Sequence, residues 1–251
     1  MNLSVDLNAD LGEGVPNEGA LLALVSSASI ACGFHAGDPL SITESVMSAR
    51  EVGVSVGAHP SLADRENFGR TELPTTAPEV FALVSYQLGA FQAIATSLGV
   101  RPNHVKPHGA LYNMAARDLA LAEAVAHAVL AADSSLILFA PEGSALARAA
   151  AAIDLRIARE VFADRNYLAD GSLVPRSRPD ALLHDAEEAA RRVLRMLREN
   201  VVTTVEGDDL VIHADTICVH GDTPEAVAFV GELRGELAAA GIKVAAPLAS
   251  R

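Results

Sequence analysis

Short apolar runs alternate with longer segments of helical period along nearly the whole chain. Most of the runs are apolar on both faces, which is typical of strands in a covered parallel sheet. The expected strands lie at residues 3–7, 28–32, 53–58, 104–106, 135–140, 155–162, 216–220 and 242–246. The expected helices lie between them, at residues 39–51, 78–97, 118–132, 143–152, 179–198 and 224–240.

Residues at the ends of the helical segments support this division. Asp38 and Pro39 stand where a helix prefers its N-cap and its first residue. A Thr-Pro-Glu sequence opens the last helical segment at residues 223–225. Gly99 and Gly241 follow periodic runs, at the place where a helix C-cap favours glycine.

Seven or eight strand–helix alternations within 251 residues predict an α/β fold, namely a (β/α) TIM-like barrel that is complete or lacks one unit. An open doubly wound sheet is the alternative. The sequence contains neither Gly-x-Gly-x-x-Gly nor a Walker A pattern, which counts against the usual modes of nucleotide binding. Because no linker rich in Pro or Ser divides the chain, residues 1–251 are expected to form a single domain.

The composition excludes several classes of protein. A formal net charge of −13 argues against a nucleic-acid partner, and the basic cluster at residues 191–198 is interpreted as a solvated helix face. No apolar run reaches about 18 residues, so no membrane span is expected. Without a recognisable leader, the protein is expected in the cytoplasm. Cys32 and Cys218 lie inside apolar runs and are expected to be buried thiols with no part in the site.

Polar residues gather where the expected strands end, which in a barrel is the face that carries the active site. His35, His59, His108 and His220 each fall at or just past the end of a separate strand. One such histidine alone would be interpreted as a turn or core residue, but four on one face favour a function. The remaining histidines are expected to be structural or superficial, namely His104, His127, His184 and His213.

Lys106 and two acidic residues are further candidates for chemistry. The chain has only two lysines, and a lysine can change protonation when desolvated, whereas arginine cannot. Asp10 and Glu13 follow the first strand, where they could be a general base, metal ligands, or partners of a helix dipole after Glu18. Carboxylate and imidazole groups suit Zn²⁺, so Asp10, His35 and His59 are candidate metal ligands, although no HxxxH pair supports them.

Six sequence segments together resemble the LamB/YcsF family. They are "DLNADLGE" (6–13), "SIACGFHAGDP" (29–39), "GAHPSLADRENFGR" (57–70), "HVKPHGALYN" (104–113), "EVFADRNYLADGSLVPR" (160–176) and "ICVHGDTPEAV" (217–227). They run in order through nearly the whole chain, so the combination is highly specific. The departures from the family pattern are Ser29, where Asn is expected, and the loop at residues 62–71.

The resemblance implies a fold like the glycoside hydrolase/deacetylase-type barrel. It also implies the role of the A subunit of an ATP-dependent 5-oxoprolinase, which acts with subunits B and C. That enzyme hydrolyses the lactam of 5-oxo-L-proline to L-glutamate while ATP, with Mg²⁺, is cleaved to ADP and phosphate. Whether this chain or a partner binds the ATP is left open by the sequence.

The same resemblance suggests roles for the candidates. Asp10 or Glu13 would activate water that His35 and His59 orient, and Lys106 and His108 would stabilise negative charge. Arg165 or Arg176 would bind the substrate carboxylate. The full set of candidate substrate-binding residues is Asn8, Arg70, Tyr112, Asn113, Arg165, Arg176, His220 and Asp222.

Two alternative functions stay open on the sequence. A metal-dependent amide or sugar deacetylase could use the same barrel face without ATP. A non-catalytic subunit could bind a ligand in the same polar pocket. Stoichiometric Zn²⁺ would favour the first, and retention of activity without the polar side chains would favour the second.

Overall fold

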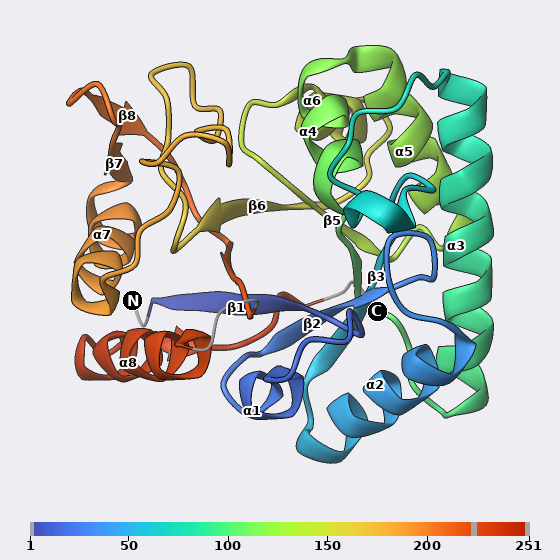
Figure 1. Cartoon of the computed structure of the whole chain (residues 1–251), viewed down its shortest axis with the longest axis horizontal. Helices are drawn as coiled ribbons and strands as arrows, with labels where there is room; N and C mark the ends of the chain where they lie inside the picture. The colour runs from blue at the N-terminus through green and yellow to red at the C-terminus, as the bar shows by residue number, and fades with distance from the viewer. Residues whose placement is uncertain (1–2, 222–224, 249–251) are drawn as a thin grey trace.

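The computed structural model describes residues 3–221 and 225–248, which form a closed barrel of parallel strands surrounded by helices (Figure 1). Consecutive barrel strands are hydrogen-bonded in chain order, and β9 pairs with β1 to close the ring. The barrel prediction is therefore confirmed, in a seven-stranded form. The strands are β1 (Ser4–Leu11), β2 (Ser27–Ala31), β3 (Ser55–His59), β4 (His104–Val105), β5 (Ile137–Ala140), β6 (Ile157–Phe162) and β9 (Thr216–Val219).

The last predicted strand exists but does not enter the ring. This strand, β10 (Lys243–Val244), pairs only with the start of β1. The N–H of Lys243 donates to the carbonyl of Leu3, and the N–H of Ser26 donates to the carbonyl of Leu7, each at 2.9 Å. Since Leu3 and Leu7 are four residues apart on a strand, both carbonyls face one edge. β10 and β2 therefore pair with the same edge of β1, β10 at the start of the strand and β2 further along it.

Helices cover the outside of the barrel, with α3 to α6 on one side and α7 and α8 on the opposite side in Figure 1. The helices are α1 (Glu18–Leu22), α2 (Pro39–Val52), α3 (Ala77–Ser97), α4 (Gly109–Arg117), α5 (Leu119–Ala132), α6 (Ala145–Ala152), α7 (Ala186–Glu199) and α8 (Ala226–Ala239). A 3₁₀ turn, η1 (Arg65–Asn67), and a two-stranded antiparallel sheet of β7 (Val201–Thr203) and β8 (Asp209–Val211) complete the described structure.

The capping signals locate the helix starts well. Asp38 caps α2, because its carboxylate accepts the N–H groups of Leu40 and Ser41 at 2.9 Å, and Pro39 is the first helical residue. α7 starts at Ala186 rather than at residue 179, since the preceding residues form a long loop with short bridges. The expected Thr-Pro-Glu opening of α8 lies largely outside the described residues.

The interior of the barrel contains buried polar side chains as well as apolar ones. His104 is a core residue, as expected: its Nε2 lies 3.1 Å from the Ser29 hydroxyl, and its ring stacks on Phe139 at 4.2 Å. A Cβ at Gly57 would lie 2.3 Å from the His104 ring, so only glycine fits there. Several polar side chains of the barrel strands are fully or almost fully buried, namely Asp6, Asn8, Ser29, His104, Glu160 and Thr216.

One helix has the length and composition of a membrane span. α3 is 21 residues long and has a mean hydropathy of 1.2. No membrane span was expected from the sequence, because no run of about 18 residues is apolar throughout. In the structure α3 packs against α5, and Val80, Val84, Leu88 and Phe91 are buried. Other large side chains of α3, Phe81 and Tyr86, are exposed.

Candidate active site

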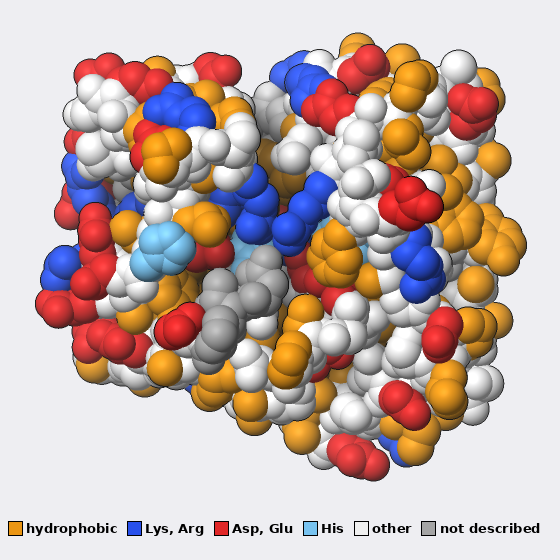
Figure 2. Space-filling view, viewed as in Figure 1, with side chains coloured by type: hydrophobic (Ala, Val, Ile, Leu, Met, Phe, Trp, Pro, Cys, Tyr) orange, Lys and Arg blue, Asp and Glu red, His pale blue; other side chains and the backbone are white. Residues whose placement is uncertain are grey.

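A cavity of about 1070 Å³ opens where the barrel strands end. Lys and Arg side chains gather around a hollow near the centre of the face in Figure 2. The cavity is lined by five of the six catalytic candidates, namely Asp10, Glu13, His59, Lys106 and His108, while His35 lies behind them. It is also lined by six of the substrate-binding candidates, namely Arg70, Tyr112, Asn113, Arg165, Arg176 and His220.

Lys106 lies at the floor of this cavity, directly after β4, and is only 3 % exposed. Its ammonium lies 2.9 Å from the Asp10 carboxylate and 3.0 Å from both the Glu160 carboxylate and the Asn8 side-chain oxygen. Burial opposes its charge, but Asp10, Cys218 and Glu160 together raise the pKa of Lys106 well above its usual value. Lys106 is therefore protonated at neutral pH, and its ammonium is paired with two carboxyl groups.

Cys218 is a buried free thiol, as expected, and it contacts Lys106 from beneath the floor. Its Sγ lies 3.0 Å from the Lys106 Nζ, and burial raises the pKa of the thiol. The relevant signal was the period of two along β9, because Thr216, Cys218 and His220 must share one face of the strand. Cys32 is a free buried thiol, as expected.

Asp10 links the lysine to a histidine cluster. One carboxylate oxygen contacts Lys106, and the other lies 3.3 Å from the Nε2 of His59. Burial alone would raise the pKa of Asp10, but the charges of His59 and Lys106 hold it well below its usual range. Asp10 is therefore a carboxylate at neutral pH, and it lines the cavity.

Three of the four strand-end histidines meet beside Glu13. The Glu13 Oε1 atom lies 3.0 Å from the Nε2 of His35, 3.3 Å from the Nδ1 of His108 and 3.8 Å from the Nε2 of His59. The His35 and His108 rings stack with their centroids 3.8 Å apart. Burial and then the charge of Asp10 raise the pKa of Glu13 to about 7. Burial, followed by the charge of His59, lowers the pKa of His35 to about 3.

The fourth histidine, His220, belongs to a second group, in which its ring lies within 4.8 Å of the ligand atoms of Asp10 and Cys218. His220 follows β9, and its Nδ1 lies 2.7 Å from an Asp164 carboxylate oxygen. Although burial opposes the charge, Asp164 raises the pKa of His220 well above its usual value. The four strand-end histidines thus form a cluster of three and a fourth ring, His220, and Asp10 lies close to both His59 and His220. Asp222 lies outside the described residues.

The arginine candidates border the opening of the cavity. Arg165 is buried; its Nη2 donates to the carbonyl of Val174 at 2.7 Å, and its Nε has no hydrogen-bond partner among the described residues. Arg70 and Arg176 line the same cavity. Tyr112 is buried and Asn113 is exposed. Asn8 is buried beneath the floor, where its amide donates to Glu160 at 3.1 Å.

The loop that carries Glu13 is held from below by Glu18. The Glu18 carboxylate accepts the backbone N–H groups of Gly12, Glu13 and Gly14 at 2.8–2.9 Å. The possibility that Asp10 and Glu13 stabilise the dipole of the following helix is therefore wrong, since both side chains contact the histidines instead. Glu18 therefore supports the loop, a role that its place in the sequence did not predict.

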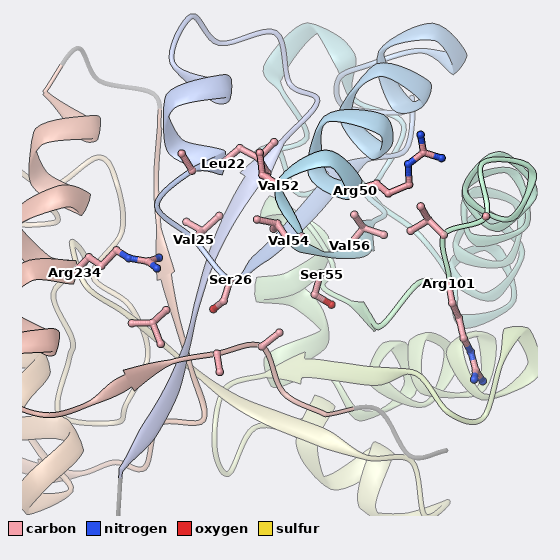
Figure 3. A pocket seen from close by; sticks show the side chains of 17 residues that line it. Leu22, Val25, Ser26, Arg50, Val52, Val54, Ser55, Val56, Arg101 and Arg234 are labelled. Carbon is pink, nitrogen blue, oxygen red and sulfur yellow. The ribbon is translucent and has the colours of Figure 1, made fainter.

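A second cavity, of about 700 Å³, lies at the opposite end of the barrel, where β2 and β3 begin (Figure 3). Most of the residues that line it have aliphatic side chains. Three arginines border it, and each donates a hydrogen bond to a neighbouring loop or side chain, namely Arg50, Arg101 and Arg234. The described residues that line it include no histidine and no carboxylate. The reactive groups are thus concentrated at the other end.

Comparison with known proteins decides the family. The model of the LamB/YcsF family matches residues 5–251. The chain belongs to the LamB/YcsF family. A protein from Bordetella pertussis, named as the A subunit of 5-oxoprolinase, is 49% identical over 251 residues, which cover 98% of this chain and 100% of that protein. The resemblance seen in the six sequence segments is thereby confirmed.

Solved structures support the same assignment. The lactam utilization protein from Thermus thermophilus superimposes on this LamB/YcsF chain with a TM-score of 0.91 at 43% identity, covering 98% of this chain and 100% of that one. The polysaccharide deacetylase Bc1974 from Bacillus cereus gives a TM-score of 0.51 at 14% identity, covering 99% and 93% of the two chains. This second likeness concerns the fold alone, and it confirms the expected deacetylase-type barrel.

Proposed function

We propose that this chain is the A subunit of an ATP-dependent 5-oxoprolinase and that its barrel mouth carries the hydrolysis of the lactam. Membership of the LamB/YcsF family and the names of the full-length relatives support the substrate class. The observation that carries the assignment of the site is Asp10. It is a carboxylate facing the cavity, held between the Lys106 ammonium at 2.9 Å and His59 at 3.3 Å.

The chemistry explains why ATP is needed. A five-membered lactam is an unactivated amide that re-forms readily, so its hydrolysis must be coupled to a downhill reaction. In the proposed sequence the lactam oxygen attacks the γ-phosphorus of ATP, and ADP leaves. A water then attacks the ring carbonyl carbon, and the C–N bond breaks as the nitrogen takes up a proton. A second water releases phosphate from the resulting acyl phosphate and leaves L-glutamate.

Asp10 is the proposed acceptor of the proton from the attacking water. A general base must be unprotonated at the working pH and must reach the water. Asp10 meets the first condition because Lys106 and His59 lower its pKa, and it meets the second because it lines the cavity. The three N–H groups of Lys106 are already shared among Asn8, Asp10, Cys218 and Glu160. Lys106 therefore acts through its charge rather than through a free donor.

Arg165 is the proposed partner of the substrate carboxylate. Its guanidinium is buried at the cavity and has an Nε without a partner among the described residues. A carboxylate is the ligand that satisfies such a group best, because the planar fork of arginine matches it. Subunits B and C and Mg²⁺–ATP complete the proposed enzyme. The sequence has no Walker A pattern, so ATP binds either to this chain in another way or to a partner subunit, and the titration below distinguishes the two.

The test is reconstitution. The chain is mixed with subunits B and C, and ADP and L-glutamate are measured with and without 5-oxo-L-proline. We expect ADP and L-glutamate to form only when both 5-oxoproline and this chain are present. The two products should form in equal amounts. Isothermal titration of ATP into the chain and into the complex then locates the nucleotide. Formation of glutamate at the same rate when this chain is omitted would contradict the proposal.

A further inference from the structure

Four side-chain atoms of the kind that bind metal ions converge in the histidine cluster beside Glu13. One ligand atom from each of Glu13, His35, His59 and His108 lies within 4.8 Å of all the others. The Nε2 of His59 and the Nδ1 of His108 are only 2.8 Å apart. Whether these inner nitrogens carry a proton or a lone pair depends on the tautomer of each ring.

The outer nitrogen of each ring determines its tautomer. The Nδ1 of His59 lies 2.6 Å from the carbonyl of Lys106, and the Nε2 of His108 lies 2.8 Å from the carbonyl of Phe68. A carbonyl oxygen can only accept, so both outer nitrogens donate. When the two rings are neutral, their inner nitrogens therefore present lone pairs to each other and to the Glu13 carboxylate.

His35 follows the same pattern. Its Nδ1 lies 2.9 Å from the Ser61 hydroxyl, whose own proton goes to the carbonyl of Leu62 at 2.9 Å. The Nδ1 of His35 therefore donates, and its Nε2 points a lone pair at Glu13. Outer nitrogens fixed by backbone or hydroxyl oxygens, with inner lone pairs converging, are the arrangement found around metal-binding histidines.

The geometry selects three of these four side chains. His59 and His108 meet edge to face at 89°, so their lone pairs can converge, whereas His35 and His108 are stacked at 5° and their lone pairs lie in parallel planes. Glu13, His59 and His108 also line the cavity, and His35 does not. The distances among the three inner atoms are 2.8, 3.3 and 3.8 Å. Tetrahedral Zn²⁺ with bonds of about 2.0–2.1 Å holds its ligand atoms about 3.3 Å apart.

We propose that Glu13, His59 and His108 form a binding site for a divalent transition-metal ion of the Zn²⁺ type, with its open coordination position facing the cavity. Imidazole and carboxylate are the ligands that such ions prefer, and three protein ligands leave a position for water or substrate. The site differs from the sequence-based candidates Asp10, His35 and His59 by two residues. Its test requires neither 5-oxoproline nor ATP, so it stands apart from the proposed reaction.

The experiment measures binding of Zn²⁺ and Co²⁺ to the full chain after removal of metals with a chelator. We expect one ion per chain, and for Co²⁺ an absorption spectrum of four- or five-coordinate geometry. Glu13→Gln and His108→Gln are expected to weaken binding by about 100-fold. The matched control is His213→Gln, because His213 borders the same cavity but is paired with Glu142 at 2.9 Å. This variant should bind within twofold of the wild type.

A measurement on the unaltered chain guards against variants that fail to fold. Crystals soaked in Zn²⁺ should show an anomalous-scattering peak among the side chains of Glu13, His59 and His108. Absence of stoichiometric binding by the wild type would overturn the proposal. So would a peak elsewhere, or binding that folded Glu13→Gln and His108→Gln proteins retain.

Discussion

At the scale of single residues, Lys106 has the largest expected effect on stability. Its ammonium is the cation between the buried carboxylates of Asp10 and Glu160. Lys106→Met keeps the length of the side chain but removes the ammonium that both carboxylates contact. Breaking a buried pair in this way costs about 3–5 kcal/mol. We expect a loss of this size in the free energy of unfolding, measured in urea at pH 7. The control is Lys243→Met, which removes an exposed lysine; an equal loss in both variants would contradict the account.

Asp6 gives the protein a pH dependence of a definite sign. Burial raises the pKa of Asp6 from 3.8 to about 6, although Ser26 and Thr216 donate to it. The unfolded chain therefore releases this proton near pH 4, while the folded chain keeps it until about pH 6. A raised carboxyl pKa stabilises the folded state at low pH, and this contribution is lost as the pH rises. Two pKa units correspond to about 3 kcal/mol.

The comparison with Asp6→Asn isolates this effect. The free energy of unfolding of the wild type minus that of the variant is expected to fall by about 3 kcal/mol between pH 3.5 and pH 7. Denaturant titrations at several pH values measure the difference. A difference that stays constant or rises over this range would show that Asp6 is not held protonated by burial.

The sequence located most of these side chains but not their partners. The strand ends predicted where the histidines, Asp10 and Lys106 would lie, because strand ends in a barrel share one face. The pairing of His220 with Asp164 could not be predicted, because the two residues are 56 positions apart in the chain. The contact between Cys218 and Lys106 was not predicted, because a thiol in an apolar strand resembles any other core residue until the lysine opposite it is known.

At the scale of elements, the loop after β3 positions the histidine cluster through Gly69. This residue has a φ of +66°, and a Cβ there would lie 2.8 Å from the Cβ of His35 and 2.9 Å from the His108 ring. Gly99 has a similar φ of +72° but open space around it. Gly99→Ala should lower the free energy of unfolding by about 1 kcal/mol, which is the cost of placing alanine in a left-handed conformation.

Gly69→Ala should lower the stability of the folded protein more than Gly99→Ala does, because the added Cβ collides with the histidines as well as straining the backbone. Thermal unfolding and Zn²⁺ binding of the two variants measure the difference. We expect Gly69→Ala to be the less stable protein and to bind Zn²⁺ more weakly than Gly99→Ala. Equal behaviour of the two variants would show that the loop yields without disturbing the cluster.

Elements with strong local signals were predicted, whereas α1, β7 and β8 were not. α2 and α3 were found because a cap residue and a proline mark their starts. α1 has five residues, and β7 and β8 have three residues each, which is too short to show a period. β10 has the apolar pattern of a barrel strand, yet only Ser4 and Val5 of β1 pair with it. Whether a strand joins the ring depends on distant partners rather than on its own residues.

At the scale of the whole molecule, closure of the barrel joins the two ends of the chain. β1 and β9 are paired through Asp6–Ala9 and Thr216–Val219, so neither can open without breaking the ring. The β7–β8 sheet lies outside the ring, and Val211 within it is 69% exposed. We therefore expect amide hydrogens of β1 and β9 to exchange together and at least tenfold more slowly than those of β7 and β8. Mass spectrometry of exchanged peptides measures this, and equal protection would contradict the role of closure.

The central claim is that the barrel mouth of this chain performs the hydrolysis of 5-oxoproline with Asp10 as the base. The most direct measurement is the rate of L-glutamate formation by the complex reconstituted with Asp10→Asn, which keeps the size of the side chain but removes its basicity. We expect turnover to fall by about 100-fold or more while the complex still assembles, and Lys243→Met to remain active. Turnover close to that of the wild type in a folded, assembled Asp10→Asn complex would contradict the account.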